Sequence, residues 1–158
     1  SKTAVRMAAK RQFQAQLAVD SGFNLALFDN SIDCAISVFS PISATEATRV
    51  LKPEGLMIMV GPGAQHLSGL TAHIYDKPVP HGGNFKALDE STEFSLIGQT
   101  DIQESINVQG SAIADLLGMT PYYWHATPQQ QESLGKLENL ETEIHFNIRL
   151  YQNCSVPA

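Results

Sequence analysis

The sequence has few cysteines and no long apolar run. Its two cysteines are Cys34, in a run expected to form a buried strand, and Cys154, near the end of the sequence. Neither indicates a disulfide framework, so a reducing, cytoplasmic location is expected. The apolar runs are too short to cross a bilayer, and the first residues show no secretory pattern, so no membrane association is expected.

Charged residues are also scarce, at 16% of the chain, and the formal net charge is −6. This balance argues against a free-standing binder of polyanions. Basic residues nevertheless gather in the first eleven positions, which hold four of the ten: Lys2, Arg6, Lys10 and Arg11. They form either a solvated helix face or a patch that contacts phosphate groups, and the pattern leaves both readings open.

The length and composition indicate one globular domain. A chain of 158 residues with 43% hydrophobic residues can bury a sizeable core. No internal repeat, low-complexity stretch or interdomain linker divides it. We therefore treat residues 1–158 as a single domain.

Residues 29–63 carry the strongest structural pattern. Two apolar runs, residues 34–39 and 56–60, flank a helix that Ser43 begins and Pro53 ends. Strand, helix and strand in this order predict a βαβ unit, which belongs to a parallel sheet. Ligands of open α/β sheets bind beyond the carboxyl ends of the strands. Here those ends are residues 40–41 and 61–63.

Weaker patterns predict the other elements. Residues 2–11, 65–75 and 104–117 are expected to be helical, and Thr127 to begin another helix with Gln130 completing a capping pair. Alternating residues predict strands at 13–19, 92–99 and 144–151. The aromatic residues are densest at positions 119–124.

These segments together resemble a known family. The resemblance is based on seven segments: SKTAVRMAAKR, LFDNSIDCAISVFSP, EATRVLKPEG, GPGAQHL, IYDKP, LLGMTPYYW and FNIRLYQ. In this order the chain resembles the bacterial 23S rRNA guanine-N1 methyltransferases, S-adenosylmethionine enzymes of the Rossmann-like class. The GPGAQHL and MTPYYW segments are the most specific. The resemblance implies an α/β class I methyltransferase sheet with a C-terminal antiparallel strand pair, and methylation of guanine N1 in ribosomal RNA.

The resemblance also shows departures from the family. The family's cysteine-rich zinc module, its glycine-rich loop, the acidic residue that binds ribose and the first two strands have no counterpart in this sequence. The resemblance therefore implies the C-terminal part of the domain, inactive and weak in cofactor binding on its own, with zinc only in the absent module. Glu54 stands where the family usually has glycine.

The resemblance assigns cofactor contacts to five residues. Asp20 and Ser21 follow the strand that would contact adenine, although a plain strand-ending turn is the alternative. Ser37 and Phe39 match the segment between cofactor and acceptor, and Phe39 could equally be a core residue. His66 matches a histidine at the cofactor site, with an exposed helix-start histidine as the alternative.

Aromatic and basic residues are the candidates for binding the RNA and the guanine that accepts the methyl group. Tyr122 and Trp124 could stack an extruded guanine, or could pack a corner between helices. The other expected RNA-binding residues are Ser40, Pro41, Lys2 and Arg6. Asp76 is the candidate base that removes the N1 proton. A small-molecule methyltransferase or metabolite-binding domain on the same fold is the alternative function.

Two further expectations concern metals and pairing. His66, His73 and His81 are seven and eight residues apart, which fits no compact zinc pattern, so no metal site is expected. With the two strands absent, residues 1–19 are expected to pair with residues 34–39 or with another copy of the chain, which would give a homodimer through exposed sheet edges.

Overall fold

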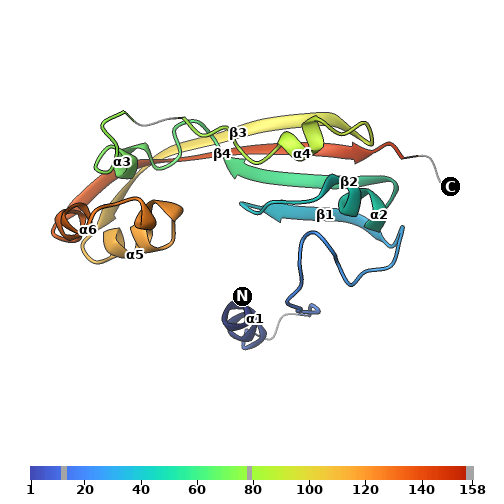
Figure 1. The fold of residues 1–158 in the computed structure, drawn as a ribbon, viewed down its shortest axis with the longest axis horizontal. Coiled ribbons are helices and arrows are strands. Elements are labelled where there is room, and N and C mark those ends of the chain that lie inside the picture. Colours follow the sequence, from blue (N-terminus) through green and yellow to red (C-terminus); the bar gives the residue numbers. More distant parts are fainter. Residues whose placement is uncertain (12–13, 78–79, 156–158) are drawn as a thin grey trace.

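A computed structural model describes residues 1–11, 14–77 and 80–155. Its centre is one mixed four-stranded sheet in the order β1-β2-β4-β3 (Figure 1). The strands are β1 (Ile32–Val38), β2 (Leu51–Pro62), β3 (Phe94–Gln109) and β4 (Asn139–Asn153). β1 and β2 are parallel, whereas β4 runs antiparallel to both β2 and β3. The predicted α/β sheet with a C-terminal antiparallel pair is confirmed.

The described residues form seven short helices, and all except α1 lie near the two ends of the sheet (Figure 1). They are α1 (Lys2–Ala9), α2 (Ala44–Val50), α3 (Ser68–Thr71), α4 (Lys86–Asp89), α5 (Ala112–Gly118), η1 (Pro121–Trp124) and α6 (Pro128–Gly135). α2 and α4 lie at the end where the sheet is four strands wide (Figure 1). β3 and β4 extend beyond β1 and β2, and α3, α5 and α6 lie at that far end.

The predicted βαβ unit is present. The Ser43 side chain caps α2 by accepting from the Glu46 amide at 3.2 Å, and β1 pairs in parallel with β2. The predicted stop at residues 52–55 becomes a bulge within β2, because Ile32 pairs with Leu51 and Cys34 with Leu56. Glu54 in this bulge has a φ of 62°.

Two apolar clusters form the core. The first lies where α2 and α4 pack on the sheet: Ala47, Leu51, Met57, Met59, Phe85, Leu88, Phe94 and Tyr151. The second lies among α3, α5, α6 and the far end of β4: Leu67, Leu70, Ile74, Ile113, Leu117, Ala126, Leu134 and Leu140. Along β2 the buried residues alternate with half-buried ones, so only one face of that strand is fully covered.

Some predictions about β1 and its neighbours are wrong. Cys34 is exposed because β1 is an edge strand whose alternate side chains point away from the covered face. Residues 14–19 form no strand, and they do not pair with β1 in the part of the chain that the structure describes; Phe13 lies outside it. Alternation alone does not make a strand when no neighbouring strand supplies hydrogen bonds. Pairing with another copy stays a prediction.

The predicted helix 104–117 is also largely wrong. Residues 104–109 continue β3, and the helix begins only at Ala112. Ile106 and Val108 are the half-buried positions here, two residues apart, while their neighbours are exposed. Pairing with β4 along the whole of β3 decides the conformation. The predicted helix at 65–75 is reduced to the single turn of α3, whereas α6 has the predicted capping box.

The segment before β1 is held by α2. The Arg49 guanidinium donates to the carbonyls of Leu25 at 2.9 Å and Leu27 at 2.8 Å, and it pairs with Asp29 at 2.6 Å. Glu46 accepts from the Leu25 amide at 2.6 Å. Arg49 and this amide hold the pKa of Glu46 at about 2, so the contact persists throughout the neutral range. Figure 1 shows α1 apart from the sheet.

Candidate functional site

The candidate site lies beyond the carboxyl ends of β1 and β2. Phe39, directly after β1, has a φ of 50° and donates its amide to the Val60 carbonyl at 2.9 Å. Phe39 is 45% exposed. The turn after β2 carries Gly63 and His66, so the two strands bring Phe39 and His66 to one edge of the sheet.

Phe39, His66 and Phe146 form one ring cluster. The Phe39 centroid lies 5.3 Å from that of His66 and 5.6 Å from that of Phe146, and His66 and Phe146 are 5.3 Å apart. Phe146 belongs to β4 and was not predicted as a site residue. Phe39 is therefore neither free in solvent nor part of the core; its ring packs against two others and stays partly exposed.

Two further histidines, His81 and His145, lie beside His66 of this cluster. The His66 Nδ1 accepts from the His145 amide at 3.3 Å, and the ring of His81 lies 6.2 Å from that of His66. Burial lowers the pKa of His66, and the neighbouring His81 and His145 add to the shift. Burial also lowers the pKa of His81, whose Nε2 bonds to the Tyr122 hydroxyl. Both rings are neutral hydrogen-bonding groups at pH 7.

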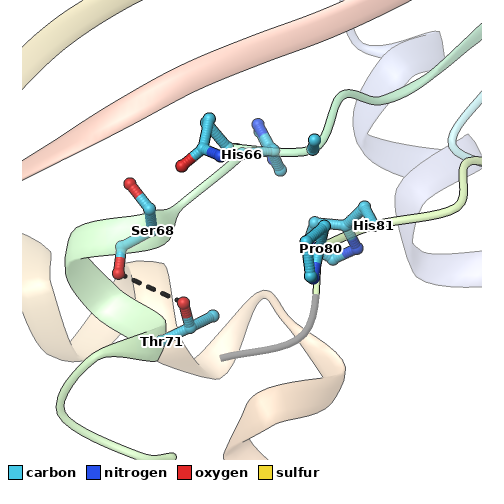
Figure 2. Close-up of a pocket in the computed structure, with 7 residues that line it drawn as sticks. His66, Ser68, Thr71, Pro80 and His81 are labelled. Carbon is cyan, nitrogen blue, oxygen red and sulfur yellow. Dashed lines mark hydrogen bonds between the residues drawn. The ribbon is translucent and has the colours of Figure 1, made fainter. Parts of the chain in front are cut away.

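Two hollows open beside His81. The smaller, of about 80 Å³, lies between the His66–Ser68–Thr71 segment and the facing Pro80 and His81 (Figure 2). The larger, of about 270 Å³, lies toward β3 and β4. It is lined by Pro62, Gly63, Ala64, His81, Gly82, Gly83, Phe85, Asp101, His145, Asn147 and Arg149. Gly63 is required here, because a Cβ at this position would lie 2.2 Å from the His145 ring.

Ser37 and Ser40 support the loop after β1. Ser37 is buried, and its hydroxyl donates to the Ser40 carbonyl at 3.1 Å. The Asn84 amide donates to the same carbonyl at 3.0 Å, which ties this loop to the segment before α4. Ser37 therefore shapes the site through the backbone. Asn84 was not predicted, since it lies 44 residues from its partner.

Asp20 and Ser21 form a turn that meets the same loop. The Asp20 carboxylate accepts from the Ala26 amide at 2.6 Å and the Ser21 amide at 2.9 Å, and these two hydrogen bonds lower its pKa. A Cβ added to Gly22 would lie 3.3 Å from the Pro41 carbonyl oxygen. The structure thus places this turn beside Pro41, while the carboxylate is engaged in shaping its own turn.

The expected acceptor-side residues are dispersed. Tyr122 is half-buried against the second core cluster, whereas Trp124 is 83% exposed and packs edge-on against Tyr123 at 5.2 Å. Packing between helices thus accounts for Tyr122 but not for Trp124. Asp76 lies in an exposed bend after Tyr75. Lys2 and Arg6 are exposed on α1, the helix that lies apart from the sheet (Figure 1).

Neither a metal centre nor a membrane span was found in residues 1–11, 14–77 and 80–155. Within these ranges no three histidine, cysteine, aspartate or glutamate side chains gather closely enough to hold a metal ion. Every helix there is too short or too polar to cross a bilayer.

Comparison with known proteins identifies relatives of the chain. A 23S rRNA (guanine(748)-N(1))-methyltransferase of Streptomyces fradiae is 30% identical over 132 residues, which cover 82% of this chain and 47% of that protein. A Micromonospora griseorubida protein with the provisional name 23S rRNA (guanine-N(1)-)-methyltransferase is 32% identical over 130 residues, 81% of this chain and 44% of that protein. The chain is related to the bacterial 23S rRNA guanine-N1 methyltransferases. It spans about half the length of these relatives, and no family profile matches it.

Solved structures show the methyltransferase fold. A Bacillus halodurans protein provisionally described as a methyltransferase superposes with a TM-score of 0.56 at 13% identity, over 98% of this chain and 78% of that one. The YcgJ protein of Bacillus subtilis gives a TM-score of 0.51 at 13% identity, over 99% and 78% of the two chains. The sheet is thus a partial Rossmann-like methyltransferase sheet.

Proposed function

We propose that the chain contributes to an S-adenosylmethionine-dependent enzyme of the cytoplasm that methylates N1 of a guanine in 23S rRNA. The relatives support this activity by name, and the fold supports methyl transfer in general. The observation that carries the proposal is the cluster of Phe39, His66 and Phe146 at the carboxyl ends of β1 and β2, where open α/β sheets bind their ligands.

The residues at this edge fit the methyl-donor cofactor. The exposed part of Phe39 offers an apolar surface, and the Asp20–Ser21 turn, which meets Pro41, offers polar groups for an adenine. His66 and the loop held by Ser37 complete this wall. The cofactor would supply the methyl group. The chain's own residues would orient the acceptor base and exclude water from it.

The acceptor is expected to approach over the exposed aromatic and polar groups. Trp124 is largely exposed and offers a ring face on which a base of the RNA can stack, and Tyr122 packs against His81. Ser40 and Pro41 border the cofactor side, and Lys2 and Arg6 would contact phosphates. We keep Asp76, exposed and next to Tyr75, as a candidate proton acceptor.

An exposed edge supports self-association. In β1, Ile36 is 65% exposed and Val38 57% exposed, and the strand pairs on one side only within the described residues. Unpaired apolar edges recruit partners. We propose a homodimer through this edge. Sedimentation equilibrium would show it, and replacement of Ile36 by lysine should return the chain to a monomer.

Deletion of the gene tests the enzymatic proposal. N1-methylguanine cannot form a Watson–Crick pair, so it stops reverse transcriptase at one position of 23S rRNA. The deletion strain should lose one such stop and the corresponding N1-methylguanine in nuclease digests, and a plasmid copy should restore both. An unchanged N1-methylguanine content of 23S rRNA would reject the proposal.

A further inference from the structure

The larger hollow contains a carboxylate that neighbouring side chains hold in a fixed direction. Asp101 lies on β3, opposite Asn147 of β4. Its Oδ1 accepts from the Asn147 side-chain amide at 2.8 Å and lies 3.4 Å from the His145 Nε2. No donor among the described residues contacts the second oxygen, Oδ2. The Asp101 side chain itself is 51% exposed.

The partners of Asn147 and His145 decide which of their atoms face Asp101. The Arg149 Nε donates to the Asn147 Oδ1 at 3.2 Å, so the Asn147 amide nitrogen is the atom turned to Asp101. The Gln65 amide donates to the His145 Nδ1 at 3.2 Å, which leaves Nε2 as the protonated nitrogen of the neutral ring. Both neighbours are therefore donors to one oxygen of Asp101.

Arg149, which orients Asn147, is itself held in place by other residues. It forms two hydrogen bonds to Asp89, at 2.9 and 2.7 Å, and its guanidinium lies 4.2 Å from the centroid of the Phe85 ring. Its charge is thus neutralised within the protein rather than offered to a phosphate. What the hollow presents to a ligand is an acceptor, the Oδ2 of Asp101.

The walls of the hollow suit a flat ring. His81 supplies a ring to the wall, and Gly82 and Gly83 add no side chains that would narrow the hollow. Gly83 has a φ of 73°, and a Cβ there would lie 2.4 Å from Phe85, so a larger residue cannot replace it. At about 270 Å³ the hollow has room for a nucleobase.

We propose that this hollow is the acceptor-base site and that Asp101 recognises guanine through its 2-amino group. The 2-amino group is a donor that adenine and hypoxanthine lack, and a carboxylate is the side chain that accepts from it most strongly. Enzymes that act on an extruded base read its Watson–Crick edge in this way. The assignment rests on the proposed function, and it makes Asp101 a determinant of specificity.

Nucleotide binding by the whole chain tests the assignment without methyl transfer. Guanosine 5′-monophosphate and inosine 5′-monophosphate differ only in the 2-amino group, so contacts to ribose and phosphate cancel. Titration followed by the amide resonances of residues around Asp101 should give about tenfold or more tighter binding of the guanine nucleotide, as expected for one hydrogen bond to a charged group.

Two variants sharpen the test. Asp101→Asn should abolish the preference, because its amide would turn a donor toward the 2-amino group, whereas Asp115→Asn on the exposed surface of α5 should keep it. Thermal unfolding checks that both variants fold. Equal affinity for the two nucleotides, no binding of either, or a preference that survives in Asp101→Asn would overturn the assignment. A guanine preference without any effect of gene deletion on 23S rRNA would instead reject only the proposed reaction.

Discussion

Glu54 has a backbone conformation that ordinarily favours glycine. Its φ of 62° lies in the left-handed region, where a side chain costs about 1 kcal/mol relative to glycine. The resembling family usually has glycine here, the residue that this backbone conformation favours. The bulge after α2 therefore carries strain.

Glu54→Gly should raise the free energy of unfolding by about 0.5–1 kcal/mol, because it removes this strain. Urea unfolding followed by circular dichroism measures the change. Glu132→Gly, in the middle of α6, is the matched control and should lower the stability by a similar amount. A lower free energy of unfolding for Glu54→Gly would show that contacts of the Glu54 side chain stabilise the fold by more than the backbone strain destabilises it.

His66 and His81 make the stability depend on pH. Burial lowers the pKa of both rings in the folded state below 6.5. Between the lowered values and 6.5, the unfolded chain binds more protons than the folded chain, so the stability contribution of the neutral rings is complete above this window and decreases as the pH falls through it. Acid should therefore weaken the site before it affects the carboxylates.

The unfolding free energy should fall as the pH drops below roughly 6.5, and His66→Gln and His81→Gln should each reduce this dependence. Urea midpoints measured above and below this pH give the slope. His73→Gln, at an exposed position, serves as the control and should leave the slope unchanged. Identical slopes in the wild type and both site variants would contradict the assignment.

Among the elements, α2 and β2 are joined by a buried asparagine from the other end of the chain. Asn153 is fully buried, and its side-chain amide donates to the carbonyls of Leu51 at 3.3 Å and Lys52 at 3.1 Å. These carbonyls lie where β2 begins, at the start of the strained bulge. The last residues of β4 thus complete the βαβ unit.

Asn153→Ala should lower the unfolding free energy by about 1–3 kcal/mol, because buried carbonyl groups would lose their donor. Asn139→Ala, at the exposed start of the same strand, should change it by less than about 0.5 kcal/mol. Thermal and urea unfolding of the two variants give the comparison. Equal effects would mean that strand pairing, rather than this amide, stabilises the junction.

Elements with local signals were predictable from the sequence. The caps at Ser43 and Thr127 act within one turn, so their residues alone announce α2 and α6. β3 is different, because pairing with β4 over residues 94–109 overrides the local pattern that suggested a helix. In residues 14–19, by contrast, the sequence alternates as in a strand, but no neighbouring strand pairs with it among the described residues and no strand forms.

On the scale of the whole molecule, the site combines residues far apart in sequence. The positions of Phe39 and His66 were predictable, because each follows a strand end in a recognisable motif; their roles stay a prediction. Phe146, His145 and Asp101 were not, because they lie within β3 and β4 and reach the site only through the antiparallel pairing. The sequence therefore identifies the site residues that follow strand ends, whereas the residues that strand pairing brings to the site are found only in the tertiary structure.

The central claim is that the cluster at the carboxyl ends of β1 and β2 takes part in guanine methylation. The most direct measurement is the N1-methylguanine content of 23S rRNA in the deletion strain complemented with Phe39→Ala, His66→Ala or, as a control, His73→Ala. At equal protein levels, the two cluster variants should restore at most about a tenth of the modification, as loss of a positioning contact predicts, and the control should restore it fully. Full restoration by Phe39→Ala and His66→Ala would contradict the claim.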